Sequence, residues 1–220
     1  MFPPKCIFCG KTGGTKEEGN SSGTQEICKE CIGKISFYKS DFVKSDDSFE
    51  THFMKVSAAC EYKGYIRKSM LKFKFNEMGY FYRGLSYLMY EKIKNHDEYR
   101  RIDLITSVPM HPVKEKERGY NQARLLAKGL SIHMGVECDG HILEKIKITT
   151  TQSLLKSEDR AANVKDSFVV KKRQKVKDKK ILLVDDIFTT GATLNECSRM
   201  LAEAEAKYVV CAVLASGRML

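Results

Sequence analysis

Four consecutive aliphatic residues at positions 181–184, Ile-Leu-Leu-Val, constrain the fold of this chain more than any other feature. A run without polar alternation needs burial on both faces, which is typical of a parallel strand covered by helices on both sides. An amphipathic helix follows, because apolar residues recur at spacings of three, four and three, at Leu194, Cys197, Leu201 and Ala204. The segment therefore predicts an α/β protein built on an open parallel sheet flanked by helices.

Two adjacent carboxylates, Asp185 and Asp186, follow the aliphatic run where the predicted strand leaves the core. A turn of small residues then leads into the helix, and it consists of Thr189, Thr190, Gly191, Ala192 and Thr193. Backbone N–H groups, threonine hydroxyls and the positive end of the helix converge there and suit a single phosphate. The carboxylates cannot bind that phosphate, but they accept hydrogen bonds from sugar hydroxyls. The two features predict a phosphorylated sugar, bound beyond the carboxyl end of the strand.

This segment resembles the fingerprint of type I phosphoribosyltransferases, which bind 5-phosphoribosyl 1-pyrophosphate (PRPP). The resemblance implies that Asp185 and Asp186 hold the 2′ and 3′ hydroxyls of the ribose, and that residues 189–193 hold the 5′-phosphate. It also implies Mg²⁺ bridging the pyrophosphate oxygens and hydroxyls and, if the protein is an enzyme, displacement of pyrophosphate from the anomeric carbon. The alternative, a strand that ends in solvated acids, explains neither the adjacent carboxylates nor the threonine turn.

The N-terminal region contains two Cys-x-x-Cys pairs, Cys6 with Cys9 and Cys28 with Cys31, separated by the 18 residues from position 10 to position 27. This spacing is typical of a four-thiolate zinc site. The region has almost no apolar residues, so a metal would replace a hydrophobic core, and four protein sulfurs leave no open position for catalysis. A redox-active pair, the alternative, would need a βαβ context that the sequence lacks. The other four cysteines are predicted to be packed, reduced thiols: Cys60, Cys138, Cys197 and Cys211.

A narrower resemblance, to the ComF (GntX-like) competence family, covers most of the chain. It rests on the four-cysteine region and on these segments: 73–75 (Phe-Lys-Phe), 108–112 (Val-Pro-Met-His-Pro), 118–123 (Arg-Gly-Tyr-Asn-Gln-Ala), and 151–154 (Thr-Gln-Ser-Leu) with Arg160, Asn163 and Phe168. That family joins a small zinc module to a phosphoribosyltransferase-like domain and is associated with DNA uptake during natural transformation. The resemblance implies a phosphoribosyltransferase-like open parallel sheet flanked by helices, preceded by a small four-cysteine, zinc-ribbon-like module.

The turn after a predicted strand at residues 102–108 is a second candidate for phosphate binding, through Met110, His111 and their backbone amides. The enzymes that the segment resembles place pyrophosphate at this turn. A lone histidine is more often a surface or packing residue, and for His111 this alternative stays open.

Three cations are candidates for catalysis: Lys156, Arg160 and Arg118. The first two lie in a polar segment at 148–163, which is too long for a tight connection and fits a mobile loop that closes over pyrophosphate. The sequence departs from the family at Lys114 and Lys116, where arginines are usual, so the charge is kept but the bidentate fork is lost. Tyr120 in place of the usual phenylalanine is expected to be a minor change.

A polar stretch at residues 40–50 predicts a linker. It divides the chain into residues 1–45, the four-cysteine zinc-binding module with its linker, and residues 46–220, the phosphoribosyltransferase-like domain. In the second part, periodicity predicts strands at 56–62, 102–108, 142–146, 168–170 and 208–215, and helices at 65–75, 81–93 and 121–134. Aromatic residues crowd the segment before residue 100, and we interpret them as core rather than as a platform for an acceptor base. They are Tyr62, Tyr65, Phe73, Phe75, Tyr80, Phe81 and Tyr82.

The chain carries 38 Lys and Arg against 28 Asp and Glu, a net charge of +10, which favours anionic partners. A basic run adds to this charge: Lys171, Lys172, Arg173, Lys175, Lys177, Lys179 and Lys180. The run supports an alternative function, a non-catalytic component of the transformation machinery that binds single-stranded DNA or senses nucleotides. The other interpretation of the basic run is a solvated loop.

No apolar stretch suits a signal peptide or a membrane span, so we expect a cytoplasmic protein without membrane insertion. The expected partners are PRPP or a related phosphorylated sugar, single-stranded DNA and competence-machinery proteins.

Overall fold

The computed structural model of the protein describes residues 5–12, 26–39, 41–43, 51–75, 78–148 and 162–217. Among these residues the main sheet has five strands, in the order β1 (Phe42–Val43), β2 (Lys55–Glu61), β7 (Tyr208–Ser216), β6 (Lys180–Phe188) and β3 (Leu104–Ser107). β2, β7, β6 and β3 run parallel, and β1 pairs antiparallel with β2 at one edge. A separate antiparallel pair is formed by β4 (Leu143–Lys145) and β5 (Phe168–Val170). The predicted open parallel sheet is confirmed.

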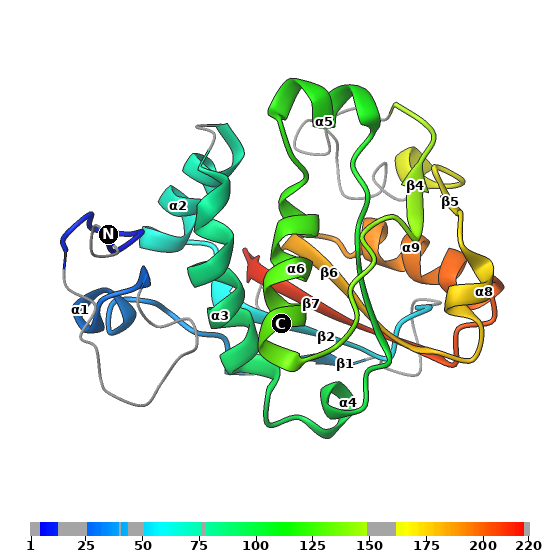
Figure 1. Ribbon diagram of the computed structural model, residues 1–220, viewed down its shortest axis with the longest axis horizontal. Coiled ribbons are helices and arrows are strands. Elements are labelled where there is room, and N and C mark those ends of the chain that lie inside the picture. Colours follow the sequence, from blue (N-terminus) through cyan, green and yellow to red (C-terminus); the bar gives the residue numbers. More distant parts are fainter. Residues whose placement is uncertain are drawn as a thin grey trace.

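Helices cover both faces of this sheet. One face carries α2 (Gly64–Phe75), α3 (Tyr82–Ile93) and α6 (Gln122–Met134), and the other carries α8 (Arg173–Val176), α9 (Ala192–Glu203) and the β4–β5 pair. Shorter helical segments connect these elements: α1 (Lys29–Ile32), the 3-10 turn η2 (Gly79–Phe81), α4 (Asp97–Arg100) and α5 (Pro112–Arg118). Figure 1 shows α6 beside α3 and across β6.

The central strand β6 is buried on both faces, as residues 181–184 predict. Ile181 and Leu183 pack into the core shared with α9, whereas Leu182 and Val184 pack into the core shared with α3 and α6. All four side chains are fully buried. The apolar face predicted for the following helix is also confirmed, because its members are buried in the α9 core: Leu194, Cys197, Leu201 and Ala204. β6 therefore separates two hydrophobic cores.

The end of β6 differs from the prediction that the acidic pair follows the strand. β6 continues through Asp185 and Asp186, because β7 keeps pairing with it to its last residue. On the other side β3 ends, with Ser107 opposite Val184. One edge of β6 thus loses its neighbouring strand just where the carboxylates begin. The acidic pair lies inside the strand, beyond the end of β3.

The other predicted elements are found within a few residues of their expected bounds. The helix predicted at 81–93 begins one residue later, because Phe81 closes the turn η2. Phe73 and Phe81 are buried, which confirms the core interpretation for these two aromatics, whereas Tyr80 is 57% exposed. Among the described helices, none combines the length and apolarity needed to cross a membrane.

Part of the predicted linker is structured, because Phe42–Val43 forms β1 and pairs with β2. The neighbouring Asp41 carboxylate is 6% exposed and lies 2.9 Å from Lys92 Nζ and 3.1 Å from Lys55 Nζ. These ion pairs tie the segment to β2 and α3. A two-residue strand has no periodicity to detect, so the sequence pattern indicates only its polar surroundings. The domain boundary between residues 45 and 46 lies outside the described residues and stays a prediction.

α3 and α6 approach each other closely at Gly129 of α6. A Cβ atom at this position would lie 2.1 Å from Ser86 Oγ on α3, and both residues are buried. Such an approach is possible only because glycine has no side chain. It sets how closely α6 packs against α3.

Candidate functional site

Asp185 and Asp186 point to opposite faces of the sheet, because successive side chains alternate along a strand. Asp185 continues the row that packs against α9, and Asp186 continues the row that faces α2. Both side chains are half-buried, and the backbone N–H of Asp186 donates to Asp185 Oδ1 at 2.8 Å. The pair therefore presents one carboxylate on each side of β6.

Burial raises the pKa of Asp185 to about 8, and the negative charge of Asp186 acts in the same direction. The backbone N–H of Asp186 and the charges of Lys74 and Lys145 oppose this shift. A carboxyl with this pKa is mostly protonated at neutral pH. The pair thus avoids carrying two full negative charges side by side.

Lys74, near the end of α2, contacts this pair directly, and the sequence analysis assigned it no role. Its Nζ lies 2.7 Å from Asp186 Oδ2, and the two side chains are only 22% and 13% exposed. Burial opposes the charged form of the lysine, but the carboxylates of Asp186 and Asp185 raise the pKa of Lys74. The sequence feature that could have indicated this contact is Phe-Lys-Phe at 73–75, where a lysine lies between two apolar residues at the end of a predicted helix.

The predicted phosphate turn lies directly after β6, at the N-terminus of α9. Gly191 is the N-cap of α9 and has a φ of 81°, a left-handed conformation that favours glycine. A Cβ atom there would lie 3.0 Å from the Phe188 ring. The Thr190 hydroxyl accepts from Ala192 N at 3.4 Å, and all five residues of the turn, 189–193, are half-buried. The turn and the acidic pair come together at one end of β6, and their binding roles stay predictions.

The turn after β3 runs alongside β6, since Val108 N donates to a β6 carbonyl at 2.9 Å. Asn121 Nδ2 donates to Val108 O at 3.0 Å and fixes this turn from the start of α6. His111 caps α5, because its Nδ1 accepts from Val113 N at 3.3 Å. Met110 and His111 are half-buried, and their predicted contacts with pyrophosphate stay predictions.

Residues 118–122, here called the brace segment, hold the end of α2. Tyr120 Oη and Gln122 Nε2 both donate to the carbonyl of Phe73, at 2.6 Å and 3.1 Å. Arg118 Nη1 donates to Gln122 Oε1 at 2.9 Å and so orients that amide. The Tyr120 hydroxyl therefore makes a contact that phenylalanine could not make, and the expectation that this change is minor stays a prediction.

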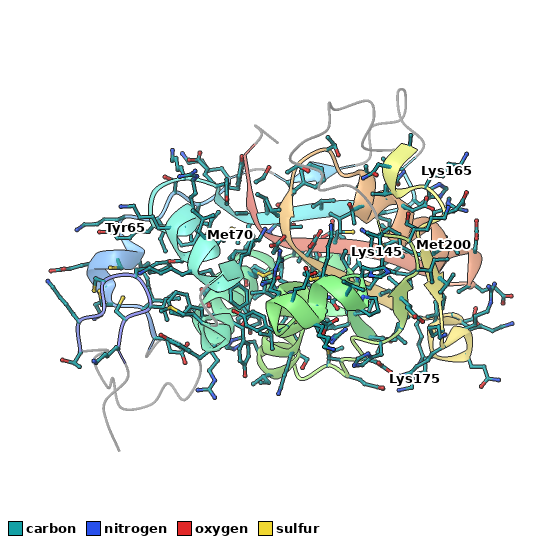
Figure 2. All side chains as sticks on the ribbon, turned by 90° about the horizontal axis from the view of Figure 1, so that it is seen from above. Tyr65, Met70, Lys145, Lys165, Lys175 and Met200 are labelled. Atoms are coloured by element: carbon teal, nitrogen blue, oxygen red, sulfur yellow. The ribbon has the colours of Figure 1, made fainter. Side chains whose placement is uncertain are left out.

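Lys145, on β4, is a second cation near the acidic pair to which the sequence analysis assigned no role. Burial lowers the pKa of Lys145 and the nearby charge of Lys114 lowers it further, while Asp185 acts in the opposite direction. Lys145 Nζ lies 5.4 Å from the centre of the Phe168 ring, and the residue is half-buried, toward the middle of the view in Figure 2. The catalytic role of Arg118 stays a prediction. Two other predicted cations lie outside the described residues: Lys156 and Arg160.

The four N-terminal cysteines come together as predicted: Cys6, Cys9, Cys28 and Cys31. Their sulfur atoms all lie within 4.8 Å of one another, and the sulfurs of Cys9 and Cys28 are 3.8 Å apart. Although burial opposes ionisation, backbone N–H groups, that of Cys28 foremost, lower the pKa of Cys6 to about 7. The thiolate is the form that binds a metal. The set could bind a metal such as zinc, and it fits a small zinc module.

The cysteine cluster is attached to the α2–α3 layer. A Cβ atom at Gly84 of α3 would lie 3.0 Å from Ile7 Cδ1, and Glu26 Oε2 accepts from Gly84 N at 3.0 Å. The Phe8 ring lies 5.9 Å from the ring of Tyr65, which Figure 2 shows at the cysteine end of the molecule. The buried cysteines of the cluster belong to the same core as α3. This region therefore contributes to the main core, which its composition did not lead us to expect.

The remaining cysteines and the basic run have structural explanations. The four other cysteines are free thiols, as predicted, and Cys138 is the half-buried one among them. Lysines of the basic run pair with acids: Lys171 with Glu144 at 3.0 Å, Lys172 with Asp139 at 2.6 Å, Lys175 with Glu137 at 2.9 Å and Lys177 with Glu205 at 2.7 Å. Figure 2 shows Lys175 at the periphery. These contacts favour the interpretation of the run as a solvated, charge-matched surface.

Comparison with known proteins agrees with this geometry. The family model described as "Phosphoribosyl transferase domain" matches residues 118–219. Competence protein F of Haemophilus influenzae is 28% identical over 214 residues, which cover 91% of this chain and 92% of that protein. Competence protein ComFC of Streptococcus pneumoniae is 35% identical over 119 residues, 54% of this chain and 49% of that protein. DNA utilization protein YhgH of Escherichia coli is 32% identical over 99 residues, 45% of this chain and 43% of that protein.

The family match contains the brace segment, β6, the acidic pair and the turn that follows it. The similarity to Competence protein F extends over nearly the whole chain. The resemblance inferred from the sequence is therefore confirmed. The chain is a homologue of Competence protein F and Competence protein ComFC, and it carries a phosphoribosyl transferase domain together with an N-terminal four-cysteine cluster.

Proposed function

We propose that this protein binds PRPP together with Mg²⁺ at the carboxyl end of β6. The observation that carries the proposal is the pair of half-buried carboxylates followed, in one strand–turn–helix segment, by the turn at 189–193. The ribose hydroxyls would bind Asp185 and Asp186. The 5′-phosphate would bind the turn, where the first amides of α9 have no acceptor within the helix.

The pyrophosphate group would bind beside the turn after β3. Its proposed partners are the backbone amides of Met110 and His111 and the side chains of Arg118, Lys156 and Arg160. Magnesium prefers oxygen ligands, and here it would take them from the pyrophosphate and the sugar hydroxyls that the acidic pair orients. Bound there, Mg²⁺ would offset the negative charge of the pyrophosphate. The residues of the chain would bind the PRPP and orient it around the Mg²⁺.

We further propose that the four cysteines hold zinc in a structural role. Support comes from their spacing in the sequence and the close approach of their sulfurs. Four thiolates complete a tetrahedral shell and leave no position open for a substrate.

The names of the relatives, Competence protein F, Competence protein ComFC and DNA utilization protein, support a role in DNA uptake or use. We therefore propose a cytoplasmic protein that works with competence-machinery proteins and single-stranded DNA. The alternative of a non-catalytic DNA-binding or nucleotide-sensing component loses one of its supports, because lysines of the basic run are paired with acids.

Calorimetric titration of the zinc-loaded protein with magnesium PRPP tests the proposed site. We expect wild type to bind in the micromolar range, and the Asp185→Asn/Asp186→Asn variant to bind at least about 100-fold more weakly, because it loses the charged carboxylate of Asp186 and the carboxyl of Asp185 that accept from the sugar hydroxyls. Asp97→Asn is the control, since that carboxylate is 91% exposed on α4.

Two results would contradict the proposed function. One is absence of PRPP binding by wild type. The other is equal affinity of wild type and the double variant, which would place the sugar elsewhere.

A further inference from the structure

The contact between Lys74 and Asp186 brings the α2 helix to the proposed sugar site. Lys74 lies on a different element from the strand and turn of the fingerprint, yet its Nζ is 2.7 Å from Asp186 Oδ2. Its charge also acts on Asp185. The contact is largely shielded from water, so it is screened less than a surface ion pair. A lysine held in this way is part of the site's architecture.

The brace segment sets the position of this lysine. Tyr120 and Gln122 converge on the carbonyl of Phe73, the residue before Lys74, and Arg118 holds the Gln122 amide in place. Asn121 in the same segment donates to the carbonyl of Val108, at the start of the turn after β3. These hydrogen bonds together connect the end of α2 with that turn.

The charges explain why a lysine is useful at this point. PRPP is a polyanion, and the negative charge of the acidic pair repels the phosphate groups of the ligand. A cation at hydrogen-bond distance from one carboxylate offsets that repulsion. A carboxylate has about four acceptor sites, so Asp186 can bind Lys74 and still accept from a sugar hydroxyl.

We propose that Lys74 is a positioning residue of the sugar-phosphate site, which orients Asp186 and offsets the negative charge of the acidic pair when a polyanionic sugar phosphate binds. The brace segment holds the end of α2 so that the lysine reaches the carboxylate. This inference rests on the proposed function, because the ligand is the one proposed there. Lys74 acts through Asp186 and need not touch the ligand itself.

Calorimetric titration of the full-length, zinc-loaded protein with magnesium PRPP tests the inference. We expect Lys74→Met to weaken binding at least tenfold and Lys74→Arg to stay within about threefold of wild type, because arginine restores the cation. Lys72→Met is the matched control, since Lys72 is an exposed lysine on the same helix. Melting temperatures of all variants are measured alongside.

Equal affinity of Lys74→Met and wild type would overturn the inference, and so would an equal loss in the Met and Arg variants with native melting curves. If Lys74→Met does not fold, Gln122→Met replaces it, because methionine keeps the length of the side chain and removes the amide that donates to Phe73. We expect at least threefold weaker binding there, and unchanged affinity would overturn the bracing role. If wild type does not bind PRPP, the proposed function itself fails. If wild type and Lys74→Met bind PRPP equally well, only the inference about Lys74 fails.

Discussion

The half-buried carboxyl of Asp185 lies beside a second carboxylate, and its pKa rises from an ordinary value of 3.8 to about 8. Between these pH values the folded protein keeps a proton at Asp185 that the unfolded chain has released. The contribution of Asp185 to the free energy of unfolding is therefore greatest below pH 4 and is lost as the pH rises through 8. Asparagine has a similar shape and does not ionise. We expect Asp185→Asn to exceed wild type in stability by at least about 1 kcal/mol at pH 8.5, and by less at pH 5.

Urea unfolding of both zinc-loaded proteins at the two pH values measures this difference. Asp186→Asn is the matched control, because it removes the partner of Lys74 and leaves a buried lysine behind, so it should gain no stability. Identical pH dependence of wild type and Asp185→Asn would show that Asp185 does not bind the proton.

Site residues could be predicted from the sequence where they lie close to one another in the chain. Asp185, Asp186 and the turn at 189–193 lie in one short segment, so their spacing alone indicated a shared site. Lys74 and Lys145 come from distant positions and meet the pair only through folding. The capping role of His111 likewise depends on the backbone of α5, which no sequence motif describes.

At the scale of elements, the contact between α3 and α6 depends on the missing side chain of Gly129. Alanine usually stabilises a helix interior relative to glycine, by roughly 1 kcal/mol. Here its Cβ atom would collide with Ser86 Oγ, so we expect Gly129→Ala to lower the free energy of unfolding by about 1–3 kcal/mol. Urea unfolding checks this, with Lys128→Ala on the exposed side of α6 expected to stay within about 0.5 kcal/mol of wild type.

A second substitution distinguishes a collision with Ser86 from a general effect of alanine on the stability of α6. Ser86→Gly removes the colliding atoms, so the double variant Ser86→Gly/Gly129→Ala should recover part of the stability lost in Gly129→Ala. A Gly129→Ala variant as stable as wild type would mean that the helices can move apart freely.

The sequence predicted a helix or strand correctly where the residues of that segment by themselves require burial. The four aliphatic residues of β6 need two covered faces, and the structure provides α9 on one side and α3 with α6 on the other. The extension of β6 past Val184 was not predictable in this way, because it depends on pairing with β7. β1 was missed for the same reason, since two residues become a strand only beside β2.

At the scale of the whole molecule, the cysteine cluster is continuous with the main core rather than a separate unit. Ile7 packs on Gly84 of α3, and the buried cysteines share the core of that helix. We expect about one zinc per chain, and we expect removal of zinc with a strong chelator to lower the melting temperature of the entire protein by at least about 5 °C in a single transition. Adding zinc back should restore it.

Metal analysis of two serine variants provides the control for this prediction. Cys9→Ser changes an exposed member of the cluster and should reduce the zinc content, whereas Cys138→Ser changes a half-buried cysteine outside it and should not. Protein purified without chelator that contains well under one zinc per chain would refute the assignment. A chelator effect confined to an early, separate transition would show that the module unfolds alone.

The two carboxylates of the site lie on opposite faces of β6, so each belongs to a different layer of the molecule. Asp186 is linked through Lys74 to the layer of α2, α3 and the cysteine cluster, while Asp185 faces the layer of α9 and Lys145. A sugar phosphate bound as proposed would therefore contact one carboxyl on each face of the sheet. Binding of the proposed ligand would join the two layers at the end of β6, where β3 no longer pairs with that strand.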